Sequence, residues 1–312
     1  MRTEDGKFYA WGDGRQGQLG LGVIEHLQQP ARAGGLELFG NQRLRRTAAG
    51  YHHLAVVAED GAVYTSGDGI YGQLGLGDGQ PRRRLTRVPQ AAFAGSRVIV
   101  VSCGSYHTMA LTAGHVWTCG RNVSGQLGVG DTTDRLVFTQ VDAGQFGGAR
   151  IVMAACGAFH SVVVSAEVRV WTFGYGGNGR LGHNDGKDRL VPTLLALFDD
   201  SKIVTVDAGG DHTVAVGEGV NSKMWFWTPF RHDNLLKCQK RTTLLRALSL
   251  SLSLSLSLSL SLSLSHTHSA IVSAGRLACA SGDQRTSSRP VAHAATGVTA
   301  VVCVCVCVCV CV

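Results

Sequence analysis

Short apolar runs bounded by glycine and aspartate set the pattern of this chain. The best-preserved stretch, residues 97–145, holds four of them: Val98–Val101, His107–Thr112, Val116–Cys119 and Val137–Val141. They are rich in β-branched and aromatic side chains, which is typical of strands. The repeats show no long apolar period of 3.6 residues, so the pattern predicts an all-β fold with little helix.

One four-residue phrase returns four times at a period of about 54 residues. It reads Gly-Gln-Leu-Gly in three copies and Gly-Arg-Leu-Gly in the last. A period of this size indicates an array of supersecondary units. The copies are Gly17–Gly20, then Gly72, Gln73, Leu74 and Gly75, then Gly125, Gln126, Leu127 and Gly128, and last Gly179–Gly182.

A second phrase, a small residue followed by Gly-x-x-His, lies between the copies of the first. Its histidines are spaced by 54, 53 and 52 residues: His53, His107, His160 and His212. Four short strands per unit, at this period, describe one blade of a β-propeller. The sequence therefore predicts an incomplete propeller with four antiparallel strands in each blade.

The repeated glycines and their neighbours have a structural explanation. A residue that leaves a strand into a tight loop often needs a positive φ, which glycine adopts without steric cost. In the loop that follows, Leu127 is expected to point into the blade and Asp131 to bond nearby amides. The strand-ending glycines are Gly12, Gly67, Gly120 and Gly174.

The two coupled phrases resemble the repeats of the regulator of chromosome condensation family. In that family a strand ends in aromatic-x-x-Gly, and a Gly-Gln-Leu-Gly-x-Gly-Asp loop follows. A small residue-Gly-x-x-His segment then leads into the next strand. Both phrases occur here in this order, across about residues 5–227. The resemblance implies a propeller that is seven-bladed in typical members, and the activity of the founding member is guanine-nucleotide exchange on a Ran-type small GTPase.

The phrases divide the chain into a repeat array, residues 1–230, and a tail, residues 231–312. An open array leaves a strand edge and an apolar blade face exposed at each end. We therefore expect further chain, a partner that closes the ring, or an unstable fragment. The expected units are a partial one at 5–40, full ones at 44–96, 97–149 and 150–201, and a partial one at 202–228.

The tail is built from dipeptides that a two-base DNA repeat would encode. Leucine and serine alternate over residues 248–265, His-Thr-His follows at 266–268, and valine and cysteine alternate over 302–312. We hypothesise that this is translated microsatellite DNA and that the true reading frame is lost near Thr228. A genuine low-complexity tail is the alternative. A membrane anchor is not supported, because the Val-Cys run is shorter than the roughly 20 residues of a spanning helix.

Charge and cysteine both concentrate in the tail. The chain has a net charge of +7, but residues 1–230 hold 21 basic and 20 acidic side chains. The repeats therefore do not support nucleic-acid binding. Cys103, Cys119 and Cys156 replace alanine, serine or phenylalanine of other repeats, which predicts buried small residues rather than disulfides. With no apolar signal segment at the start, we expect an intracellular compartment, cytoplasm or nucleus.

Two patterns resemble ligand sites without meeting their requirements. Residues 12–17 match the dinucleotide fingerprint, but Gln-Leu-Gly follows and cannot start the helix that the fingerprint needs. The histidines fall at equivalent positions of successive blades and would not converge on one metal ion. We expect them to bond loop backbone. The sequence thus predicts no cofactor, no metal and no catalytic residue.

One basic cluster stands out within the repeats, formed by Arg82, Arg83, Arg84 and Arg87. The simplest interpretation is a solvated loop between blades. The functional interpretation is a partner-binding patch for an acidic protein surface, a phospholipid or a phosphate.

Three functions fit these observations. A protein–protein interaction scaffold is favoured, because rigid propellers present loops for recognition. The resemblance implies a guanine-nucleotide exchange factor as the alternative, although no insertion beyond the repeat offers a wedge. The third is a fragment of a larger multidomain protein such as a ubiquitin ligase. The expected partner is a protein, for which a small GTPase is one candidate.

Overall fold

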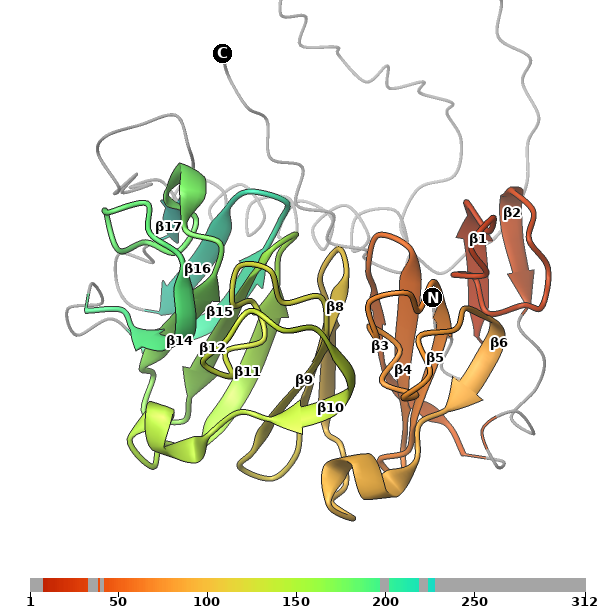
Figure 1. The fold of residues 1–312 in the computed structure, drawn as a ribbon, viewed down its shortest axis with the longest axis horizontal. Coiled ribbons are helices and arrows are strands. Elements are labelled where there is room, and N and C mark those ends of the chain that lie inside the picture. Colours follow the sequence, from red (N-terminus) through yellow and green to blue (C-terminus); the bar gives the residue numbers. More distant parts are fainter. Residues whose placement is uncertain (1–7, 33–38, 40–41, 197–201, 219–223, 228–312) are drawn as a thin grey trace, which may run out of the picture. The chain divides into compact units, whose positions relative to one another are not determined.

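The structure is a computed structural model whose described residues form five antiparallel sheets (Figure 1). It describes residues 8–32, 39, 42–196, 202–218 and 224–227. The tail hypothesis, which concerns residues 231–312, lies outside the described residues. No helix in the described part is long and apolar enough to cross a membrane.

Within each sheet the strands lie in chain order, and all neighbours are antiparallel. The first sheet pairs β1 (Tyr9–Gly12) with β2 (Leu27–Arg32). The second holds β3 (Leu44–Ala49), β4 (His53–Ala58), β5 (Val63–Gly67) and β6 (Arg82–Arg87). The third holds β7 (Val100–Cys103), β8 (His107–Leu111), β9 (Val116–Gly120) and β10 (Arg135–Gln140). The fourth holds β11 (Ile151–Cys156), β12 (His160–Ser165), β13 (Val170–Gly174) and β14 (Arg189–Leu194). The last has β15 (Lys202–Ala208), β16 (Thr213–Glu218) and β17 (Met224–Trp227).

These four-stranded sheets confirm the prediction of all-β propeller blades. Short 3-10 turns occur at η2 (Gln90–Phe93), η3 (Ala143–Phe146) and η4 (Gly177–Gly179). Two predicted strands differ in their bounds: the first strand of the best-preserved unit starts at Val100 rather than Val98, and the last covers 135–140 rather than 137–141. Val98 is fully buried in the connection instead, where its N–H donates to the carbonyl of Gly61 at 3.3 Å.

The position of a strand within its sheet decides its hydrophobic pattern. The second strands, β4, β8 and β12, have every residue buried. The outermost strands β6, β10 and β14 consist mostly of exposed and half-buried residues, with one buried residue in each of β10 and β14. A strand covered on both faces reads as a continuous apolar run rather than a strict alternation. This explains why the sequence shows short runs.

Each sheet packs on the next through an apolar cluster that belongs to that junction alone. Between the second and third sheets, Val63 packs in one cluster with Phe93 and Trp117. The rings of Phe93 and Trp117 meet edge-on, with centroids 6.0 Å apart and planes at 84°. The same edge-on pair recurs as Phe39–Tyr64 and Phe146–Trp171. The core is therefore a series of nearest-neighbour junctions, as in repeat proteins.

The Gly-Gln-Leu-Gly loops also bridge neighbouring sheets. The strand-ending Gly67 has a φ of 109°, which confirms the predicted positive φ. Leu127 is buried as predicted, and its counterpart Leu74 is buried too. Further along the loop, the N–H of Gly77 donates to the carbonyl of Leu136 in the next sheet at 2.9 Å. The equivalent bonds join Gly22 to Arg83 (2.8 Å) and Gly130 to Leu190 (3.0 Å).

Candidate protein-binding surface

The repeated histidines lie at the junctions between sheets. Nε2 of His53 is 2.8 Å from the hydroxyl of Thr108, the residue after the next histidine in the third sheet. The pairs His107–Ser161 (3.0 Å) and His160–Thr213 (2.8 Å) repeat this contact at the next two junctions. The histidines thus contact a hydroxyl side chain of the neighbouring sheet. The prediction that they bond loop backbone directly was wrong, because this hydroxyl lies between the ring and the backbone.

That hydroxyl connects each histidine to a signature loop. Thr108 donates its hydroxyl proton to the carbonyl of Gln73 at 2.7 Å. Its oxygen therefore accepts from the histidine, so Nε2 carries the proton and Nδ1 does not. Ser161 and Thr213 make the same bond, to Gln126 and Arg180. Histidine, hydroxyl and loop carbonyl form a three-group bridge at each of these junctions.

Burial keeps these histidines neutral. It lowers the pKa of His53 and His160 to about 3 and that of His107 to about 4. Among the described residues, no group of three or more histidine, cysteine or acidic side chains could hold a metal ion. His212 differs from the other three, because it lies exposed on the last described sheet. The histidines therefore act as links between sheets.

The glycine of each Gly-x-x-His phrase makes room for its own histidine. A Cβ on Gly104 would lie 2.2 Å from Cε1 of His107 and 2.4 Å from the carbonyl oxygen of Gly157. Gly50 and Gly157 face the same pair of obstacles. The coupling of glycine and histidine in the sequence is thus a packing requirement.

The glutamine of the signature loop folds back on its own turn. Oε1 of Gln73 accepts from the N–H of Tyr71 at 3.0 Å, and Gln126 does the same to Ser124. The fourth copy has Arg180 instead, only 2% exposed, and its guanidinium lies 2.7 Å from Asp211 of the next sheet. In this copy the stretch equivalent to the fingerprint-like residues 12–17, residues 174–179, ends in η4, a 3-10 turn of three residues rather than an α-helix.

The basic cluster lies on β6, the outermost strand of its sheet. Arg82 forms an ion pair with Asp78, and the same i,i+4 pair recurs as Arg135–Asp131 and Arg189–Asp185. Arg82 is therefore part of the repeated loop geometry. Arg84 lies against the loop of the first sheet, since a Cβ on Gly22 would meet its guanidinium at 2.8 Å. Arg83, Arg84 and Arg87 are exposed and Arg82 is half-buried, so the first three are the accessible members.

A cluster that the sequence reasoning missed lies on the loops that follow the first and third strands of the sheets. We call Tyr51, Tyr71, Tyr106, Arg121 and Phe159 the tyrosine–arginine cluster. Tyr106 lies at its centre, with ring centroids 6.0 Å from Tyr51, 5.5 Å from Tyr71 and 6.4 Å from Phe159. The guanidinium of Arg121 lies 4.9 Å from the ring centroid of Tyr71. Three sheets contribute to this one surface.

Within the tyrosine–arginine cluster, Tyr51 is exposed, and the other four members are half-buried. Tyr51 is 63% exposed, and Ile70, beside Tyr71 in the chain, is 65% exposed. Tyrosine and arginine are enriched in the energetic centres of protein interfaces. The signal in the sequence is an aromatic residue at loop positions where the repeat needs only a backbone turn, and these residues are not part of the motifs that the repeats share.

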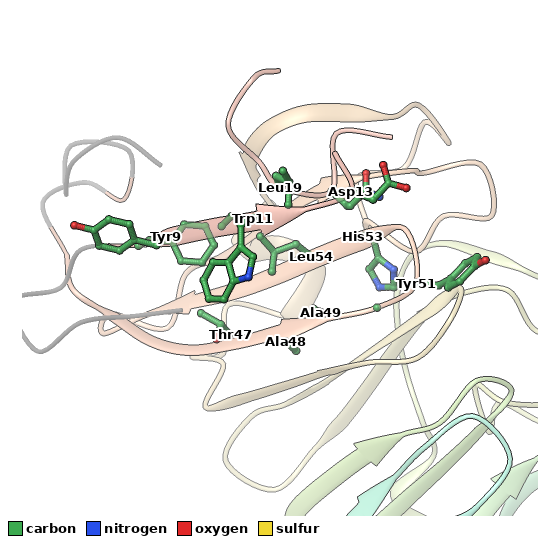
Figure 2. Close-up of a pocket in the computed structure, with 14 residues that line it drawn as sticks. Tyr9, Trp11, Asp13, Leu19, Thr47, Ala48, Ala49, Tyr51, His53 and Leu54 are labelled. Carbon is green, nitrogen blue, oxygen red and sulfur yellow. The ribbon is translucent and has the colours of Figure 1, made fainter. Parts of the chain in front are cut away.

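A cleft of about 370 Å³ separates β1 from β3 and β4 (Figure 2). The indole of Trp11 points from β1 toward Thr47 and Ala48 across it. Leu54 lines the cleft at the position that holds Thr108 or Ser161 in the next two sheets. The polar groups at its other end have partners within the chain, since Asp13 binds Arg15 and His53 binds Thr108. The cleft is suited to apolar contact rather than acid–base chemistry.

Known proteins with the same repeats can now be compared. The family model for the RCC1-like domain matches residues 1–228. The ultraviolet-B receptor UVR8 of Arabidopsis thaliana is 35% identical over 224 residues, which are 72% of this chain and 49% of the receptor. The human E3 ubiquitin-protein ligase HERC2 is 32% identical over 228 residues, 72% of this chain and 4% of the ligase.

A solved structure supports the fold. Prp20p from Saccharomyces cerevisiae superposes with a TM-score of 0.53 at 18% identity, over 72% of this chain and 67% of Prp20p. The chain spans about half the length of UVR8. The sequence match and the four-stranded sheets agree, and the chain belongs to the RCC1-like domain family.

Proposed function

We propose that this chain is a protein-binding scaffold whose contact surface is the tyrosine–arginine cluster. The main supporting observation is that the residues used for packing and the residues exposed on the loops are different ones. The signature glycines, leucines and histidines are used in contacts within and between sheets. Tyr51 and Ile70, on the loops that carry these signature residues, stay exposed. Loops on a rigid scaffold are where recognition residues concentrate.

Binding rather than covalent chemistry fits the groups on this surface. Phenol rings, a guanidinium and aliphatic side chains supply contact area and directed hydrogen bonds. UVR8, a relative by sequence, is named a receptor. We further propose an intracellular setting, in keeping with the free thiols of Cys103, Cys119 and Cys156.

A paired set of surface variants tests this function. The full chain carrying Tyr51→Ser and Ile70→Ser is compared with one carrying Val137→Ser and Leu194→Ser, two exposed apolar residues of outermost strands. Bound cellular proteins are quantified by mass spectrometry after affinity capture. We expect a defined set to disappear with the first pair and remain with the second. Identical sets in both would exclude the cluster as the contact surface.

Exchange activity on a Ran-type small GTPase is a second candidate. It is supported by the fold shared with Prp20p, whose structure is described together with its binding to Gsp1p and histones. The test is release of a fluorescent guanine nucleotide from a Ran-type GTPase on addition of the full chain. Accelerated release would establish the activity, and an unchanged rate would reject it.

A place within a larger protein is the third candidate. HERC2 contains a matching stretch that is 4% of its length. Sequencing the mature transcript upstream of Met1 and across the codons for residues 226–229 tests it. Further Gly-Gln-Leu-Gly repeats in the open frame would support it, and a message that ends with the Leu-Ser and Val-Cys runs would contradict it.

A further inference from the structure

Three arginines in the described part of the chain lie over aromatic rings, and they differ in one respect. Arg180 lies 4.5 Å from the ring centroid of Tyr175, and Arg169 lies 5.4 Å from that of Trp171. Both also hold a carboxylate, Asp211 at 2.7 Å and Glu167 at 3.7 Å. Arg121, over Tyr71, forms no ion pair with any described residue.

The guanidinium of Arg121 is held in place without being neutralised. Its centre lies 5.7 Å from the ring centroid of Tyr106 and 5.9 Å from that of Phe159, in addition to Tyr71. Its backbone N–H donates to the carbonyl of Tyr106 at 2.9 Å, which fixes the start of the side chain. Nε is buried and has no hydrogen-bond partner among the described residues. Rings hold the cation from several sides, and no described acceptor takes its hydrogen-bond donors.

The Arg180 junction shows what an arginine in this setting binds. Asp211 occupies the position just before the histidine of its phrase, and the equivalent residues of the two preceding sheets are Tyr106 and Phe159. The last junction thus supplies its own carboxylate, whereas the surroundings of Arg121 supply rings. An arginine fork matches a carboxylate in geometry and charge.

We propose that Arg121, within the tyrosine–arginine cluster, is a receptor for a carboxylate on an extended segment of a partner protein. The inference rests on the scaffold function proposed above and names the chemistry of its partner. The carboxylate of an aspartate or glutamate accepts from the guanidinium. Apolar side chains beside it in the segment pack on Tyr51, Ile70 and Tyr106. Tyr51 and Ile70 give exposed contact area, and the guanidinium of Arg121, which has no ion pair among the described residues, gives selectivity for the acid.

A matched pair of peptides tests the carboxylate. The probes are fluorescein-labelled Gly-Leu-Asp-Glu-Asp-Leu-Gly with blocked ends and the same peptide with asparagine and glutamine in place of the acids. Binding to the full chain is measured by fluorescence anisotropy at low salt. We expect the acidic peptide to bind at least about 10-fold more tightly than the amide peptide, since a charge-assisted pair is lost in the second. Equal affinities would overturn the proposal.

A matched pair of arginine variants places the site. Arg121→Gln is expected to bring the acidic peptide down to the affinity of the amide peptide. Arg169→Gln, which removes an arginine that already has a ring and a carboxylate, is expected to leave it unchanged. Circular dichroism and a urea midpoint confirm that both variants fold. Equal losses in the two variants, or none in Arg121→Gln, would overturn the assignment.

The same experiment separates this proposal from the scaffold function. If both peptides bind equally and lose affinity in the Tyr51→Ser, Ile70→Ser variant, the cluster binds partners through apolar contact and the carboxylate receptor is rejected. If neither peptide binds, the receptor is also rejected, and the capture comparison decides the scaffold function by itself.

Discussion

The repeated histidine has two structural roles in this fold. Its ring fills the space left by a glycine three residues earlier, and its Nε2–H reaches the hydroxyl of the next sheet. The ring is neutral in the folded chain, because its burial opposes the charge that protonation would bring. The residue is therefore a structural link whose strength depends on pH.

Stability is predicted to fall in mild acid because of these rings. Burial lowers the pKa values of His53, His107 and His160 to about 3 or 4 from the ordinary imidazole value of 6.5. Below pH 6.5 these histidines are protonated in the unfolded chain but stay neutral in the folded chain. The free energy of unfolding therefore decreases as pH falls toward 4. Each histidine contributes up to about 1.4 kcal/mol per pH unit. Urea unfolding between pH 7.5 and 4.5 measures the slope.

Two variants control this slope. His107→Gln, which keeps a side-chain N–H donor, should reduce it by the share of one histidine. His115→Gln, at the exposed turn between β8 and β9, should not change it. A slope that is the same in all three proteins would show that the buried histidines are not its source.

Adding one methyl group to the glycine of the phrase should damage a junction. Gly104→Ala would place a Cβ 2.2 Å from His107, with backbone of the next sheet on the other side. We expect a loss of about 1–3 kcal/mol from overpacking, with the ring displaced from Ser161. Gly210→Ala is the control, since no atom lies within 4 Å of the added Cβ. Urea midpoints compare the two, and equal midpoints would contradict the packing argument.

At the scale of elements, the repeats made most of the fold predictable. The runs around β8 and β9 have the length of strands, and the period placed them in four-stranded blades. The ends of strands were less predictable. Val98 was expected to begin a strand, but tertiary packing places it in a connection; Val137 was also expected to begin one, but β10 starts two residues earlier, at Arg135. Local pattern cannot report such a contact.

The candidate surface was harder to foresee for a related reason. A repeat search finds what the copies share, and shared residues such as Leu74 serve the scaffold. Recognition residues are those that differ, such as Tyr71 beside its counterparts Ser124 and Asn178. Tyr71, Tyr106 and Arg121 meet in one cluster because of how two successive sheets stack, which the sequence pattern does not report.

The junction between the last two described sheets should depend on its ion pair. Asp211→Ala leaves Arg180 buried without its carboxylate, and we expect a loss of about 1–2 kcal/mol, limited because Asp211 is largely exposed. Arg180→Gln restores the glutamine of the other repeats and should cost less. In the Arg180→Gln background, Asp211→Ala should have little further effect. Additive losses in a urea-denaturation cycle would show that the two side chains do not interact.

At the scale of the whole molecule, the described sheets share no single core. Every apolar cluster joins two sheets that are neighbours in sequence, so stability is distributed over a series of junctions. β8 has every residue buried, with sheets on both sides of it. The first described sheet has two strands, an arrangement that is marginal without packing. Local opening should therefore differ along the array.

Hydrogen exchange measured by mass spectrometry is predicted to reveal this gradient and its response to a junction variant. Amides of β8 should exchange far more slowly than those of β1, because opening β8 breaks two junctions. Val163→Ala, in the cluster between the third and fourth sheets, should cost about 2 kcal/mol. It should speed exchange in β11–β14 more than in β3–β6. The exposed Val137→Ala is the control. A uniform increase in all sheets would mean that the array opens as one cooperative unit, and nearest-neighbour stability would then be rejected.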